Sequence, residues 1–264
     1  MTYFERLGAR SREARSLVCV GLDPDARRHR VQDIGAFNRT IIEATAPYAA
    51  CFKPNIAFYE QFGIEGLRQL EITLAAVPTG IPVIGDVKRG DMANTAAAYA
   101  RAMFESWGFD AITVNGYQGF DAVEPFLGYE GRGVYVLCRT SNPGAREFQE
   151  LRLENGRPLY EQVALAATEW SPNVGLVVGA TAPAELARVR ELVPRTSLLV
   201  PGVGAQGGSP QDVIAAAGAE PGLIVVNASR SILYASTGPD FAEAAALAAR
   251  ALRDELAAAA TLAA

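Results

Sequence analysis

Short apolar runs rich in β-branched residues recur along the whole chain and alternate with longer, helix-like segments. Each run is apolar almost throughout, a pattern typical of parallel strands that are buried on both faces. The pattern predicts eight strands, at Leu17–Val20, Ala50–Phe52, Pro82–Ile84, Ala111–Val114, Val134–Leu137, Val174–Val178, Leu198–Val200 and Leu223–Val226.

The segments between these runs are rich in Ala, Leu and Glu and predict helices. The clearest are Asp91–Trp107, Pro158–Trp170, Pro183–Val193 and Asp240–Leu256, and the Ala-rich segment after the last is expected to fray into a tail. Eight strand–helix units in 264 residues favour a closed (β/α)₈ TIM barrel, an α/β fold, over a doubly wound open sheet. No linker divides the chain, so we expect one domain over residues 1–264.

Composition and charge narrow the class of protein. The net charge of -5 argues against general nucleic-acid binding, because proteins that bind the phosphate backbone carry a basic surface. No run approaches the length of a membrane span, and residues 1–16 lack the apolar region of a signal peptide. The widely spaced Cys19, Cys51 and Cys138 predict buried thiols in a reducing cytoplasm. A single histidine, His29, excludes a His-rich metal site.

Charged residues gather at the predicted carboxyl ends of three strands, where such barrels carry their catalytic groups. Asp86 and Lys88 lie two residues apart on an extended segment, so both side chains are expected to point the same way. Lys53 and Asp23 follow two other strands. An ion pair between Asp86 and Lys88 is a structural alternative, but the four together predict a site in which alternating charges offset the cost of burial.

Asp91 and Thr95 follow the same strand end, at the predicted start of a helix. A spacing of four residues would stack both side chains on one helix face. An acidic residue in a first turn also favours the helix dipole, so a cap is an alternative role for Asp91.

Three loops are candidates for substrate binding. Barrels often hold phosphate with the loops after strands seven and eight, here Gly202–Gly208 and Asn227–Ser231. Glycines let backbone N–H groups approach an anion, and Arg230 can add a bidentate contact. The long irregular stretch Thr140–Arg157 follows the fifth strand, and loops of that length are often functional.

The segment Asp86-Val87-Lys88-Arg89-Gly90-Asp91 fits the D-x-K-x-x-D signature of the orotidine 5'-phosphate decarboxylases, and the chain resembles that family. The resemblance runs from about Leu17 to Leu233. Within the family, the chain is similar to the longer bacterial subgroup (type 2). The resemblance also rests on the blocks Val20-Gly21-Leu22-Asp23-Pro24, Phe52-Lys53-Pro54-Asn55, Thr140-Ser141-Asn142-Pro143-Gly144 and Pro201-Gly202-Val203-Gly204-Ala205-Gln206-Gly207-Gly208.

This resemblance implies a barrel of the ribulose-phosphate-binding type that converts orotidine 5'-phosphate to UMP and CO₂, the last step of de novo pyrimidine nucleotide synthesis, with no cofactor and no metal. Lys88 would protonate C6 as the carboxylate leaves, and Asp86 would lie beside that carboxylate and crowd it. Lys53 and Asp91 would complete an alternating row of charges. Further roles implied by the resemblance are ribose contacts from Asp23 and Lys53, a pyrimidine contact from Ser141, and phosphate contacts from Gln206 and Arg230.

The resemblance also implies a homodimer in which Asp91 and Thr95 reach the ribose bound by the partner. Two other functions stay open. A metal-dependent sugar-phosphate decarboxylase or synthase on the related barrel has an acidic ligand where this chain has Lys53, and a lysine repels Mg²⁺. A phosphate-ligand sensor without catalysis would tolerate loss of the charged row, which is complete here.

Overall fold

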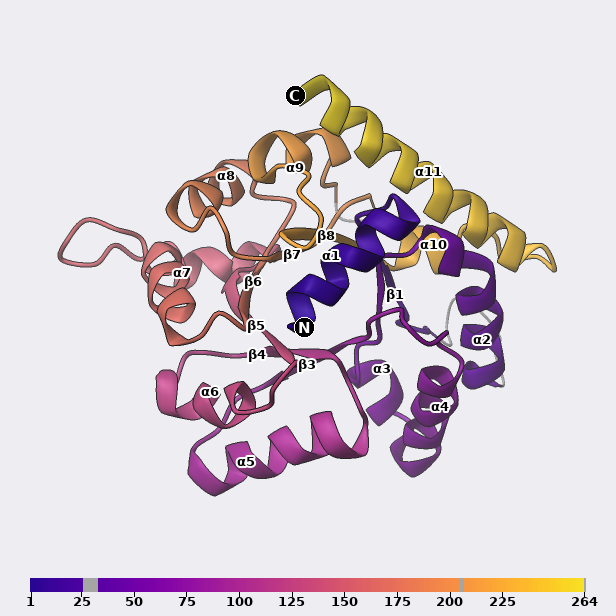
Figure 1. The fold of residues 1–264 in the computed structure, drawn as a ribbon, viewed down its shortest axis with the longest axis horizontal. Helices are drawn as coiled ribbons and strands as arrows, with labels where there is room; N and C mark the ends of the chain where they lie inside the picture. The colour runs from indigo at the N-terminus through magenta and orange to yellow at the C-terminus, as the bar shows by residue number, and fades with distance from the viewer. Residues whose placement is uncertain (26–32, 205–206, 264) are drawn as a thin grey trace.

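The computed structural model describes residues 1–25, 33–204 and 207–263. Its strands form one parallel sheet that is rolled into a barrel (Figure 1). The predicted runs lie within or beside these strands, although several strands begin or end a few residues away. The strands are β1 (Val18–Gly21), β2 (Cys51–Lys53), β3 (Ile84–Arg89), β4 (Ala111–Val114), β5 (Gly133–Arg139), β6 (Val174–Val178), β7 (Leu198–Pro201) and β8 (Ile224–Ala228).

The sheet follows the order β2-β1-β8-β7-β6-β5-β4-β3. Backbone hydrogen bonds join its outer strands, from Phe52 N to Pro82 O at 3.0 Å, from Asp86 N to Pro54 O at 2.9 Å and from Ile56 N to Asp86 O at 3.3 Å. These contacts bring β2 beside β3 and close the ring, so the predicted (β/α)₈ barrel is confirmed.

Helices surround the barrel, and none in the described residues has both the length and the apolar character needed to cross a membrane (Figure 1). They are α1 (Tyr3–Ala14), α2 (Ile34–Thr45), α3 (Ala57–Glu60), α4 (Gly63–Ala75), α5 (Ala93–Arg101), α6 (Phe120–Leu127), α7 (Leu159–Trp170), α8 (Pro183–Leu192), α9 (Pro210–Ala217), α10 (Arg230–Leu233) and α11 (Phe241–Ala263).

Two helix predictions need correction. The helix predicted over Asp91–Trp107 begins at Ala93, with Met92 as its N-cap, and becomes a π-helix over Ala102–Ser106. Asp91 therefore lies outside the helix, where its carboxylate accepts a hydrogen bond from Met92 N at 2.8 Å. The Ala-rich carboxyl-terminal segment does not fray after Leu256, because α11 continues to Ala263 and alanine is the best helix former.

Alternate residues of the strands face two different cores, as the period of two in a β-strand requires. Val18 and Val20 of β1 pack outward against the helices. Cys19 between them packs into a second, interior cluster that includes Tyr135 of β5 and Val225 of β8. The interior positions nearest the carboxyl ends of the strands are therefore the ones that can line a pocket.

Helix α1 covers the opposite end of the barrel, where the strands begin. It starts with a capping box, in which Thr2 Oγ1 accepts from Glu5 N and the Glu5 carboxylate accepts from Thr2 N. Tyr3 is fully buried in the interior cluster, and Arg6 donates to Gly131 O at 2.9 Å and pairs with Asp110 at 2.9 Å. Because Gly131 and Asp110 precede β5 and β4, these contacts fix α1 to the amino-terminal rim.

Candidate active site

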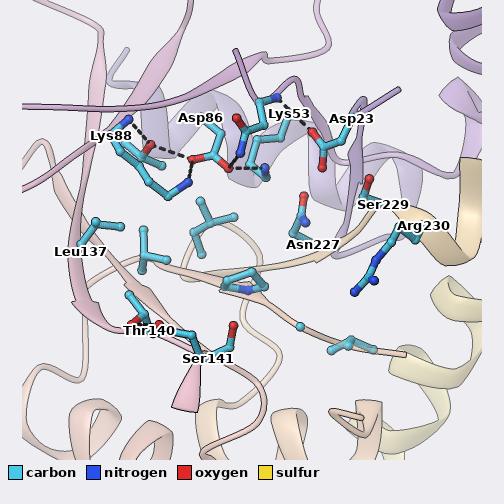
Figure 2. A pocket seen from close by; sticks show the side chains of 18 of the residues that line it. Asp23, Lys53, Asp86, Lys88, Leu137, Thr140, Ser141, Asn227, Ser229 and Arg230 are labelled. Carbon is cyan, nitrogen blue, oxygen red and sulfur yellow. Dashed lines mark hydrogen bonds and ion pairs between the residues drawn. The ribbon is translucent and has the colours of Figure 1, made fainter. Parts of the chain in front are cut away.

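A pocket of about 580 Å³ opens at the carboxyl ends of the strands (Figure 2). A volume of this size suits a small organic ligand. Charged and polar groups line the pocket together with apolar side chains, among them Leu137, Val177 and Leu199. The polar lining includes Asp23, Lys53, Asn55, Asp86, Lys88, Thr113, Ser141, Asn227, Ser229 and Arg230.

Asp86 of β3 lies between the two lysines of the pocket. Its Oδ2 is 2.8 Å from Lys53 Nζ, and its Oδ1 is 2.5 Å from Lys88 Nζ. Oδ2 also accepts from Asn55 Nδ2 at 3.2 Å, and Oδ1 accepts from Thr113 Oγ1 at 2.9 Å. Four donors thus hold both carboxylate oxygens, which fixes the carboxylate and the ammonium groups beside it.

The charges of this cluster support one another. Burial alone would raise the pKa of Asp86, but the positive charges of Lys53 and Lys88 outweigh it and lower that pKa well below its ordinary value. Burial would likewise lower the pKa of Lys53, and the nearby carboxylates of Asp86 and Asp23 raise it instead. Both groups are therefore charged at neutral pH.

Lys88 is held in an unusual backbone conformation. Its φ is +45°, in the left-handed region that non-glycine residues seldom adopt, and the pairing of β3 with β4 shifts register between Gly85 and Arg89. Thr113 Oγ1 accepts hydrogen bonds from both Val87 N and Lys88 N at 3.0 Å. The prediction of an extended backbone is thus wrong at Lys88, although the Lys88 ammonium still reaches the Asp86 carboxylate. Such a conformation costs about 1–2 kcal/mol and is common at functional sites.

Lys53 and Lys88 are the only two lysines of the sequence, in which all other basic residues except His29 are arginines. Lysine and arginine differ in chemistry, because a guanidinium keeps its protons in proteins whereas an ammonium can give one up. Both lysines line the pocket, where an ammonium group could donate a proton to a bound ligand.

Asp23 lies next to this cluster, as predicted. Its Oδ1 accepts from Asn55 N at 3.0 Å, and Asn55 itself binds Asp86 through its side chain. The loops after β1 and β2 are therefore tied to the end of β3. The charged groups predicted at these three strand ends do come together.

Arg230 and Ser141 both line the pocket, from different strands. Arg230 follows β8, and Figure 2 shows it apart from the charged cluster, with Asn227 between them. Ser141 lies in the loop after β5, where its backbone packs so closely on Gly179 that a Cβ at that glycine would lie 2.8 Å from the Ser141 Cβ. Gln206, the other predicted phosphate ligand, lies outside the described residues, as does His29.

The base of the loop that carries Ser141 is held by two polar contacts. Gln149 Oε1 accepts from Thr140 N at 2.8 Å, and Gln149 Nε2 donates to Thr140 Oγ1 at 2.9 Å. The buried Arg139 pairs with Glu150 at 2.7 Å. These contacts bind the start of the long loop to its middle and restrain Ser141.

Asp91 and Thr95 do not line the pocket of the single described chain. Thr95 is exposed on α5, and Asp91 precedes that helix, so the two do not stack on one helix face as expected. Within one chain, neither residue therefore contributes to the lining of this pocket.

Thr113, Asn55 and Asn227 contribute to the pocket, although none of them was assigned a role of its own from the sequence. Asn227 opens the predicted phosphate loop Asn227–Ser231 and Asn55 closes the block after the second strand, whereas Thr113 lies within a predicted strand. In the structure Thr113 and Asn227 lie within β4 and β8. Each stands two residues after a residue of the interior cluster, Ala111 and Val225 respectively. A polar residue at an interior position near the end of an apolar strand is the signal that would have found both.

Comparison with known proteins agrees with this arrangement. The profile of the "Orotidine 5'-phosphate decarboxylase / HUMPS family" matches residues 16–246. A protein of Thermomicrobium roseum named orotidine 5'-phosphate decarboxylase is 49% identical, over 97% of this chain and 95% of its own length. A protein of the same name from Variovorax paradoxus is 47% identical, over 98% and 99%. The structure of Leishmania donovani OMP decarboxylase superposes with a TM-score of 0.86 at 40% identity, covering 99% and 100% of the two chains.

The fold and the charged pocket define a (β/α)₈-barrel enzyme with its site at the carboxyl ends of the strands. The chain belongs to the orotidine 5'-phosphate decarboxylase family. The resemblance drawn from the sequence is thereby confirmed, and the metal-dependent sugar-phosphate alternative finds no support among these relatives.

Proposed function

We propose that this protein decarboxylates orotidine 5'-phosphate to UMP and CO₂ as a carbon–carbon lyase that uses its own side chains and no cofactor. The observation that carries the proposal is the buried carboxylate of Asp86 between the ammonium groups of Lys53 and Lys88. Relatives with nearly the same length and almost half of the same residues bear the name of this activity.

In the reaction the bond between C6 and the substrate carboxylate breaks, CO₂ leaves, and the electron pair remains on C6. Lys88 then gives a proton from Nζ to C6 and recovers one from water. The carbanion has no adjacent carbonyl that could delocalise its charge, so a preorganised cation must stabilise it. Asp86 and Thr113 hold that cation in place, through the side chain and the backbone respectively.

The remaining pocket residues would bind the rest of the substrate. We assign the ribose hydroxyls to Asp23 and Lys53, the pyrimidine edge to Ser141, and the phosphate to Arg230 and Gln206. Binding energy from the distant phosphate can then lower the barrier at C6, as remote contacts do in other enzymes. Enzymes lower barriers by about 8–23 kcal/mol, more than any single contact supplies.

We also propose a cytoplasmic homodimer in which Asp91 and Thr95 enter the site of the partner. Neither residue lines the pocket of its own chain, and Asp91 lies close in sequence to Lys88 at the rim of that pocket. Asp91 of the second chain would extend the row of alternating charges that Lys53, Asp86 and Lys88 begin.

The activity is tested by following the ultraviolet absorbance of orotidine 5'-phosphate with purified protein, with and without EDTA. We expect rapid conversion that EDTA leaves unchanged. Lys88→Ala and Lys88→Arg should each lose about 10³-fold or more in kcat, the second because arginine keeps the charge but not the transferable proton. Arg68→Ala, an exposed change on α4, is the control. A folded wild-type protein without turnover would overturn the proposal, and EDTA sensitivity would favour a metal-dependent reaction.

A further inference from the structure

Asn227 is a polar residue of the barrel interior that the proposed mechanism leaves without a role. It lies on β8, paired in register with Cys19 of β1 and Pro201 of β7, and only 8% of it is exposed. That small exposed part faces the pocket. Figure 2 shows Asn227 between the charged cluster at Asp86 and the side chain of Arg230.

The carboxamide of Asn227 is oriented by a buried thiol. Cys19 Sγ donates to Asn227 Oδ1 at 3.4 Å, from the layer of the interior beneath the pocket. A thiol donor selects the oxygen end of the carboxamide, so the Nδ2 end is left for the pocket. Among the described residues, Nδ2 donates to no acceptor. An amide donor at the edge of a pocket costs free energy unless a ligand or water satisfies it.

The neighbouring Cys51 completes this layer. Cys51 is paired in register with Cys19 and is fully buried. Burial, and then its hydrogen bond with Cys19, raise the pKa of Cys51 well above its ordinary value, so it stays a neutral thiol. Cys51 therefore adds no negative charge beneath the carboxamide.

We propose that Asn227 Nδ2 donates a hydrogen bond to an oxygen of the ribosyl 5'-phosphate part of the bound nucleotide, and that Cys19 is a positioning residue for it. The proposal deepens the proposed function and rests on it.

The position of Asn227 selects this part of the ligand. Asn227 lies three residues before Arg230, the assigned phosphate ligand, and β8 pairs with β1, the strand that leads to Asp23. Ser141, the side chain assigned to the pyrimidine edge, follows β5, which lies three strands away from β8 around the barrel. A carboxamide also adds a donor without adding charge, whereas a further cation here would repel Arg230.

The first test measures the dissociation constants of UMP and of ribose 5-phosphate by calorimetry. Asn227→Ala should weaken both by about 3- to 10-fold, the worth of one hydrogen bond to a ligand. Asn227→Asp should weaken both by more, because a carboxylate repels the phosphate and offers no donor. A folded Asn227→Ala protein with unchanged affinity for both ligands would overturn the proposal. Loss of UMP affinity alone would also overturn it, because that result places the contact on the pyrimidine.

The second test concerns Cys19. Cys19→Ala should weaken UMP binding by about 2- to 4-fold in the wild-type background and have no further effect in Asn227→Ala, since two residues that act through one contact are not additive. Cys19→Ser keeps a donor and should retain the affinity. Cys138→Ala is the matched control, because it removes another buried thiol, which donates to Tyr160 O away from the pocket. If Cys19→Ala weakened UMP binding equally in the wild-type and Asn227→Ala backgrounds, Cys19 would not act through Asn227, and its positioning role would be overturned.

These outcomes separate the inference from the proposed function. Turnover of orotidine 5'-phosphate by the wild-type protein decides the function without reference to Asn227. If the wild-type protein did not turn over orotidine 5'-phosphate, the function would fall, and the ribose 5-phosphate series would still test the contact. If neither ligand bound, both proposals would fall together.

Discussion

At the scale of single residues, the two lysines beside Asp86 differ most in their exposure. The Lys53 side chain is 4% exposed, whereas that of Lys88 is 47% exposed. The same carboxylate therefore has one buried partner and one that water can reach. Removing the Lys53 ammonium leaves the buried Asp86 charge poorly compensated. Removing the Lys88 ammonium costs less free energy, because water can reach that side of the carboxylate.

We expect Lys53→Met to lower the free energy of unfolding by about 3 kcal/mol, because removing one partner of a buried pair is strongly destabilising. Lys88→Met should lower it by less than about 1 kcal/mol. Urea denaturation followed by circular dichroism measures both. Equal losses in the two variants would mean that burial does not govern the stability of this cluster.

The lowered pKa of Asp86 predicts a dependence of stability on pH. A carboxyl whose pKa is lower in the folded chain than in the unfolded one stabilises the fold at pH above the unfolded value, about 3.9. That contribution disappears as the pH falls through this value toward the lower pKa of the folded protein. Stability should therefore fall more steeply between about pH 5 and pH 2 in the wild type than in Asp86→Asn.

Urea denaturation across that pH range measures the difference, with the exposed Asp121→Asn as the control that keeps the wild-type slope. Should Asp86→Asn fail to fold, NMR titration of the wild-type Asp86 carboxyl gives the same information. A carboxyl that titrates at its ordinary value of about 3.9 would contradict the prediction.

At the scale of elements, apolar runs alone placed the strands, because buried parallel strands are apolar on both faces. The runs ended too early at β3 and β5, whose last residues include charged ones: Asp86 and Lys88 of β3 line the pocket, and Arg139 of β5 pairs with Glu150 of the long loop. The left-handed backbone of Lys88 left no trace in the sequence, since it depends on Thr113 from the adjacent strand. Local pattern therefore predicted the barrel, and tertiary contacts decided the detail of its rim.

The loop after β5 carries the assigned pyrimidine contact, and its geometry rests on Gln149. We expect Gln149→Ala to raise KM for orotidine 5'-phosphate by about 3- to 10-fold, because Thr140 loses two hydrogen bonds and Ser141 is less well placed. Steady-state kinetics measures this change, with kcat falling less than KM rises. Glu147→Ala, an exposed change in the same loop, should match the wild type. An unchanged KM in Gln149→Ala would show that the loop keeps its geometry without this contact.

At the scale of the whole molecule, the two ends of the barrel have different tasks. The carboxyl ends of the strands form the pocket, and the amino ends are sealed by α1. Tyr3 meets Tyr135 edge to face beneath the interior layer, with ring centroids 6.1 Å apart. Changes in packing at the amino-terminal end of the barrel should therefore alter the stability of the protein but not its kinetics.

We expect Tyr3→Ala to lower the free energy of unfolding by about 3–5 kcal/mol, the usual cost of removing a large buried aromatic side chain. At temperatures where the variant stays folded, kcat and KM should equal those of the wild type. Thermal denaturation and steady-state kinetics on the same samples test both statements. A folded variant with impaired kcat would show that the two ends are coupled.

A site shared between subunits predicts complementation between two inactive proteins. Lys88→Ala and Asp91→Ala should each be inactive alone, while a mixture that has exchanged subunits should recover about a quarter of wild-type activity. Half of the dimers are then hybrids, and each hybrid has one intact site. Native mass spectrometry confirms exchange, and a mixture of two Lys88→Ala preparations is the control. Proven exchange without recovery would contradict a shared site.

The confinement of both lysines to the pocket makes the site chemically addressable. A mild acylating reagent finds no other side-chain amine on the protein, and of the two, the half-exposed Lys88 is open to attack whereas Lys53 is shielded. The mass added to one tryptic peptide would therefore count accessible sites directly. A bound nucleotide that slowed the labelling could be titrated in the same way, on unmodified protein and without an assay for turnover.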